Sequence, residues 1–125
     1  MLHTKLTLHM HSGQHVNPLQ LEVPIQPVSW LKSWGRTLVV APHQDDESLG
    51  CGGAIALLRQ MQQAVEVVFV SDGSMSHPRS QKYPADARRR LREQEAIRAL
   101  HILGVAPPSI HFMHWKDTQV PRLGS

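Results

Sequence analysis

Blocks of nonpolar residues along the chain predict three strands and two helices. Short nonpolar runs at residues 36–41, 64–71 and 109–113 are typical of buried strands. Between them, residues 49–63 and 84–103 carry nonpolar side chains at helical spacing. Strands that alternate with helices in this way favour a parallel sheet joined by right-handed crossovers. The pattern therefore predicts an α/β fold.

The first part of the chain lacks this regularity. Residues 1–35 hold scattered histidines, and three prolines interrupt any long helix. Trp30, Leu31 and Trp34 are expected to pack this segment onto the rest of the protein. We therefore predict an irregular N-terminal arm at 1–35 and a folded domain at 36–125.

A cluster of chemically active residues follows the first predicted strand. Residues 43–47, called the acidic turn below, read His-Gln-Asp-Asp-Glu, and in open α/β sheets ligands bind beyond the carboxyl ends of strands. His43 and Asp46 can point at one ion if the turn is tight, and a catalytic zinc takes three such ligands and a water. Asp45, between them, is then placed to act as a general base.

Other interpretations of this region stay open from the residues alone. A single acid at a helix start would be a cap, but three consecutive acids beside a histidine repel one another and favour a metal or catalytic site. Paired aspartates at a strand end also suit the Mg²⁺ of a phosphate enzyme. Gly50, Gly52 and Gly53 would suit a non-catalytic nucleotide- or phosphate-binding Rossmann-like module, although the acids before them would repel phosphate.

The acidic turn, with Gly52 and Gly53 after it, resembles the His-Pro-Asp-Asp-Glu signature of the PIG-L/LmbE family. Members are zinc-dependent N-acetylglucosaminyl deacetylases and related amide hydrolases. The resemblance implies a hydrolase that removes an acetyl group from an N-acetylglucosamine-type sugar or a related amide. It makes His43 and Asp46 the zinc ligands and Asp45 the catalytic base. Gln44 stands where the signature has proline, and this change removes no ligand.

The resemblance covers residues 36–118 and implies further site residues. Arg92, near the start of the second helix, would contact polar groups of the substrate, and Asp117, after the third strand, would lie on the substrate side. The loop at 71–78 would form a wall of the site. The alternative for Arg92 is a surface pair with Glu95, three residues further along the same helix.

The family's third zinc ligand belongs to a later His-x-x-His motif, beyond residue 125. His111 and His114 have the same spacing, but residues three apart on a strand point to opposite faces, so we do not assign them as ligands. We expect a Rossmann-like parallel βαβαβ sheet that is truncated after its third main strand, with nonpolar surface and a bare edge. We also expect the isolated 125-residue chain to be nearly inactive.

Composition limits the cellular location and the binding partners that we expect. The formal charge of +3 comes partly from the arginines at 88–92, and aromatic residues make up only 5%, which argues against nucleic-acid binding. Cys51 is the only cysteine, so no intramolecular disulfide forms. No nonpolar run approaches the ~20 residues of a membrane span. We predict a soluble cytoplasmic protein whose partner is a small N-acetylated sugar or amide. The oligomeric state stays open.

Overall fold

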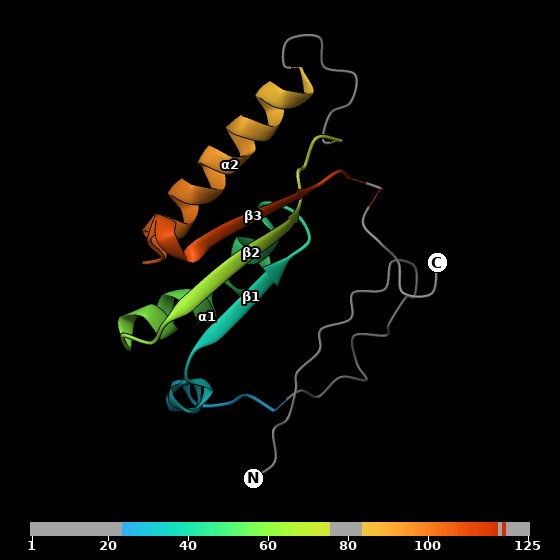
Figure 1. The fold of residues 1–125 in the computed structure, drawn as a ribbon. Coiled ribbons are helices and arrows are strands. Elements are labelled where there is room, and N and C mark those ends of the chain that lie inside the picture. The colour runs from blue at the N-terminus through green and yellow to red at the C-terminus, as the bar shows by residue number, and fades with distance from the viewer. Residues whose placement is uncertain (1–23, 76–83, 118, 120–125) are drawn as a thin grey trace.

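Three parallel strands form an open sheet in the computed structural model, which describes residues 24–75, 84–117 and 119. The strands are β1 (Thr37–Ala41), β2 (Val65–Ser71) and β3 (Ile110–Trp115), and they lie side by side in the order β1-β2-β3 (Figure 1). Val39 pairs with Val67, and Val67 pairs with Ile110. The predicted α/β fold with a parallel sheet is confirmed, and the carboxyl ends of all three strands share one edge.

Two helices connect the strands: α1 (Asp46–Gln60) and α2 (Ala85–Ile102). The prediction that the first helix spans about 49–63 was wrong at both ends. Asp46 and Glu47 form its first turn, where the helix dipole favours acids. Gly50, Gly52 and Gly53 lie inside α1, which is kinked at Cys51 (φ −146°).

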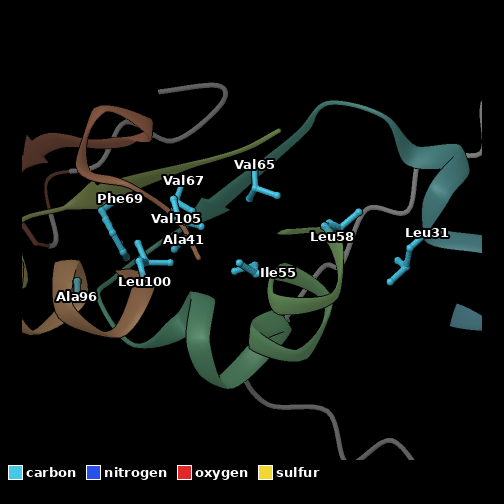
Figure 2. Packing of buried hydrophobic residues seen from close by; sticks show 10 residues of the cluster. All are labelled: Leu31, Ala41, Ile55, Leu58, Val65, Val67, Phe69, Ala96, Leu100 and Val105. Atoms are coloured by element: carbon cyan, nitrogen blue, oxygen red, sulfur yellow. The ribbon is translucent and has the colours of Figure 1, made fainter. Parts of the chain in front are cut away.

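The hydrophobic core lies between one face of the sheet and both helices. Figure 2 shows side chains of α1 and α2 packed against the strands. Phe69 of β2 also stacks on Phe112 of β3 with ring centroids 5.1 Å apart. The buried members of the core are Leu31, Ala41, Ile55, Leu58, Val65, Val67, Phe69, Ala96, Leu100 and Val105.

The opposite face of the sheet exposes nonpolar side chains. Leu38 and Val40 of β1 are 60% and 59% exposed, and Met113 of β3 is 53% exposed. Parallel sheets are usually covered on both faces. The expected nonpolar surface on a three-strand sheet is therefore confirmed.

Part of the predicted N-terminal arm packs onto the domain. Residues 28–34 form a short 3₁₀ helix, η2 (Val28–Trp34), and a second one, η3 (Pro107–Ser109), precedes β3. Leu31 joins the core, as expected. Trp30 and Trp34 pack edge to face against each other, are 44% and 38% exposed, and are not among the side chains packed on the core. Residues 1–23 lie outside the described residues.

Candidate functional site

The acidic turn joins β1 to α1 at the carboxyl edge of the sheet and is tied to the end of β2. The Pro42 carbonyl accepts hydrogen bonds from the main-chain N–H of Ser71 (3.0 Å) and from its hydroxyl (2.9 Å). The side-chain amide of Gln44 donates to the Ser71 carbonyl at 3.4 Å. These contacts hold the turn against the neighbouring strand.

His43 and Asp46 lie together within this turn. Nδ1 of His43 is 3.7 Å from Oδ2 of Asp46, and the same oxygen accepts a hydrogen bond from the His43 main-chain N–H at 3.0 Å. Two ligands of a tetrahedral zinc are separated by roughly 3.3 Å. Both side chains are about half exposed, at 51% and 49%. This pair therefore fits two positions of one metal site that is open to solvent.

Asp117 lies on the other side of the His43 ring. Its Oδ1 is 3.0 Å from Nε2 of His43, which is hydrogen-bonding distance, although this oxygen makes no aligned hydrogen bond among the described residues. Its Oδ2 accepts a hydrogen bond from the Met75 main-chain N–H at 2.9 Å. A histidine that binds a metal usually presents its other ring nitrogen to a carboxylate. The side chain is only 7% exposed, so its observed contact is with His43, and its predicted substrate contact stays a prediction.

Asp45 occupies the cap position of α1 without capping it. Its φ of 85° is in the left-handed region, which aspartate tolerates, and its side chain makes no capping hydrogen bond. Its carboxylate is 64% exposed and lies 3.2 Å from Nη2 of Arg92. The helix-cap interpretation therefore does not apply to Asp45, whose carboxylate stays accessible for chemistry.

Arg92 reaches from α2 to the acidic turn. Besides its contact with Asp45, its Nη2 donates to the main-chain carbonyl of Gln44 at 2.9 Å. In the described part of the chain no ion pair joins Arg92 to Glu95, so the geometry favours the site over the surface pair. The side chain is 22% exposed. Whether Arg92 also contacts substrate stays a prediction.

Asp72 is a buried carboxylate that the sequence placed only in a turn. It accepts hydrogen bonds from the main-chain N–H groups of Ser74 (3.0 Å) and Asp117 (3.3 Å). Burial raises the pKa of Asp72, but these hydrogen bonds and the charge of Arg89 outweigh it and hold the pKa below its ordinary value. Asp72 thus stabilises the loop that carries Met75. His77, in the same predicted loop at 71–78, lies outside the described residues.

Glu47 is also buried, which its position in the sequence did not indicate. It is 1% exposed, and one carboxylate oxygen accepts a hydrogen bond from the Ser48 hydroxyl at 2.8 Å. Burial raises the pKa of the nearby Cys51 thiol, and the charge of Glu47 raises it further. A thiol with a raised pKa is a poor nucleophile, which argues against a catalytic role for Cys51.

The two histidines of β3 do not converge. Nε2 of His111 lies 3.2 Å from Glu66 on β2, whereas Nε2 of His114 lies 2.8 Å from Glu93 on α2. The two side chains therefore point to different neighbours, as their spacing of three residues on a strand predicts. Within residues 24–75, 84–117 and 119, no group of three or more His, Cys, Asp or Glu side chains is arranged to hold a metal. The described residues thus offer one candidate pair of ligands, His43 and Asp46, and not a full set.

The glycines after the acidic turn lie within α1, which begins before them at Asp46. A phosphate-binding loop needs its glycines in front of the helix, where the free main-chain N–H groups point at the ligand. This arrangement argues against a phosphate-cradling loop at Gly50, Gly52 and Gly53.

Comparison with known proteins decides the family. The sequence pattern of the PIG-L family, described as GlcNAc-PI de-N-acetylase, matches residues 38–124. The chain belongs to the PIG-L family. A curated relative of this PIG-L chain, a diacetylchitobiose deacetylase from Thermococcus kodakarensis, is 34% identical over 87 residues. These residues make up 69% of this chain but only 31% of the relative, so the chain spans about a third of that protein's length.

Solved structures agree with the family assignment. An N,N′-diacetylchitobiose deacetylase from Pyrococcus horikoshii, bound to an inhibitor, matches the PIG-L chain with a TM-score of 0.64 and 29% identity. The match covers 69% of this chain and 31% of that one. GalB, a 4-carboxy-2-hydroxymuconate hydratase from Pseudomonas putida, matches with a TM-score of 0.61 and 28% identity, over 70% of this chain and 37% of that one. Across the described residues, no helix of the PIG-L chain is both long and nonpolar enough to cross a membrane.

Proposed function

We propose that this PIG-L chain carries part of the active site of a zinc-dependent hydrolase, at the carboxyl edge of its sheet. Its substrate would be an N-acetylglucosamine-type sugar or a related amide, from which it removes the acetyl group. The observation that carries the proposal is the placement of His43, whose ring faces a ligand carboxylate on one side, Asp46, and a buried carboxylate on the other, Asp117. The deacetylase relatives support the choice of substrate class.

The roles of the chain's own residues follow from this geometry. His43 and Asp46 would hold the zinc, which when bound acts as a Lewis acid and makes water a better nucleophile at neutral pH. Asp45 would accept the proton of the attacking water, because its carboxylate is exposed and adjacent in the turn. Arg92 holds that carboxylate in place from α2. The third ligand and the proton donor for the leaving amine would come from residues other than those described.

Metal analysis tests this proposal directly. The chain, purified without an affinity tag, should bind zinc, and His43→Ala or Asp46→Ala should weaken binding strongly. His111→Ala is the matched control, because that exposed histidine is paired with Glu66 and should leave zinc binding unchanged. Bound magnesium without zinc would instead favour the phosphate-enzyme interpretation.

Activity measurements address the reaction. We expect little acetate release from N,N′-diacetylchitobiose by the 125-residue chain, because the described residues supply only part of a zinc ligand set. Appreciable release that Asp45→Ala abolishes would show that the chain carries a complete site.

The similarity to GalB makes hydration of an unsaturated acid the competing reaction, since the two solved structures match almost equally well. The family pattern and the curated relative favour deacetylation.

A further inference from the structure

Two buried polar atoms that make no hydrogen bond within the described residues border the same small space beside Gly73. They are Oε1 of Gln44 and Nε of Arg92. A Cβ atom built on Gly73 would lie 2.5 Å from the first and 3.2 Å from the second, so both atoms lie close to the position that a side chain would fill. One atom is an acceptor and the other a donor. Because leaving such groups unpaired in the interior is costly, their proximity calls for an explanation.

The orientation of the Gln44 amide follows from its other contact. Its nitrogen lies 3.4 Å from the Ser71 carbonyl, which can only accept a hydrogen bond. The amide oxygen must therefore face away from Ser71. Gln44 is only 2% exposed, so this oxygen has no access to bulk water.

We propose that Gln44 is a positioning residue: through a small shift of either side chain, its unpaired oxygen accepts a hydrogen bond from the unpaired Nε of Arg92. Nη2 of Arg92 already donates to the Gln44 main-chain carbonyl at 2.9 Å. A guanidinium presents its N–H groups in a rigid fork, so two acceptors from one residue fix both its place and its orientation. The same Nη2 contacts Asp45, and Gln44 thereby sets the approach of Arg92 to that carboxylate.

This arrangement is particular to glutamine at this position. A proline, the residue of the family signature, keeps the main-chain carbonyl but has neither side-chain oxygen nor amide. The consequence for catalysis rests on the proposed function, because Asp45 matters only if it is the base. The contact between Gln44 and Arg92 does not rest on it.

Nuclear magnetic resonance of arginine side chains in the 125-residue chain tests the contact. The Hε signal of Arg92 is identified by its loss in Arg92→Lys. Gln44→Met keeps the shape of the side chain and removes both polar atoms. We expect solvent exchange of the Arg92 Hε to become roughly five- to tenfold faster, as for the loss of one net hydrogen bond. The Hε of Arg89, whose Nε is also buried and unpartnered, should not change.

Gln63→Met is the matched control. Gln63 also donates its amide to main-chain carbonyls, those of Leu31 and Lys32, and also has a buried oxygen without a partner, but it lies beyond the other end of α1. Arg92 exchange should be unaffected in this variant. Equal exchange rates for Arg92 in the unmodified chain and in Gln44→Met would overturn the proposal.

A measurement on the unmodified chain decides the matter if Gln44→Met does not fold. A scalar coupling between Nε of Arg92 and the side-chain amide carbon of Gln44 would demonstrate the hydrogen bond, and its absence would overturn the proposal. Neither measurement requires deacetylase activity, so failure of the proposed function and failure of this contact are distinguishable.

Discussion

Nε2 of His43 lies 3.0 Å from Oδ1 of Asp117, and this contact joins the two outer strands of the sheet at their carboxyl ends. His43 follows β1 and Asp117 follows β3, with β2 between them. The position of His43, the proposed zinc ligand after one edge strand, therefore depends on a buried carboxylate that follows the other edge strand. The order of strands in the sheet is what makes this contact possible.

Replacing Asp117 with asparagine should weaken zinc binding without unfolding the protein. The change keeps an oxygen for the Met75 N–H but removes the negative charge that faces His43. Partners of this kind are worth roughly 10- to 100-fold in metal affinity. Competition with a chelator of known affinity gives the measurement, and Asp86→Asn, on the exposed first turn of α2, is the control. Equal affinities in all three proteins would show that Asp117 does not support the ligand.

Gly73→Ala should destabilise the fold by about 2 kcal/mol. Its φ of +63° strains any L residue, and the added methyl group would lie 2.5 Å from the side-chain oxygen of Gln44. Urea unfolding measures the free energy. Gly53→Ala is the control, because nothing lies within 4 Å of its Cβ inside α1 and alanine favours helices, so its stability should hold or rise by up to ~1 kcal/mol. A Gly73→Ala protein as stable as the wild type would refute the close contact.

The contribution of Asp72 to stability should disappear in acid. Its pKa is lower in the folded protein than the ordinary value of 3.8, so the folded state favours the charged form. The stabilisation is therefore complete well above pH 3.8 and is lost as the pH falls through the lower, folded pKa. Unfolding free energies of wild type and Asp72→Asn, measured between pH 7 and pH 3, should converge toward the acid end. A difference that stays constant over this range would contradict the expected charge effect.

Cys51 should react slowly with thiol reagents. Burial raises its pKa, and the charge of Glu47 raises it further, so less thiolate is present near neutral pH than for a free cysteine. Alkylation by iodoacetamide at pH 8, followed by mass spectrometry, should be slower than for the urea-unfolded chain. Glu47→Gln should speed the reaction of the folded protein. Equal rates in the folded and unfolded chains would show that the thiol is accessible and unperturbed.

The strands were predictable because buried parallel strands appear as continuous nonpolar runs. Residues 64–71 correspond to Val65–Ser71, and the edge strands are placed nearly as well. The start of α1 was not predictable from the same signal, because its first turn holds the acids Asp46 and Glu47 and lies outside the nonpolar repeat of the helix. The helix dipole stabilises these acids in the first turn, and this effect is not visible in the pattern of nonpolar residues.

The site was predictable where its residues are adjacent in the chain. His43, Asp45 and Asp46 lie within one turn, so their proximity follows from sequence order. The contact of Asp117 with His43 and the burial of Gln44 arise between segments far apart in the chain. The turn-forming Asp-Gly pair at Asp72 marked a loop, but not the hydrogen bonds that this carboxylate accepts. Contacts of this kind depend on how β2 is aligned with β3, and this alignment cannot be derived from a local sequence pattern.

The hydrogen bonds that join Pro42 and Gln44 to Ser71 carry a thermodynamic consequence. A loop that must close around an ion loses conformational entropy when it binds, whereas a turn already fixed to the adjoining strand loses little. If the proposed zinc binds here, the His43 imidazole and the Asp46 carboxylate are held near their binding arrangement before the metal arrives. Removing the hydrogen bonds to Ser71 should reduce the affinity for the ion, even though every metal-binding atom remains.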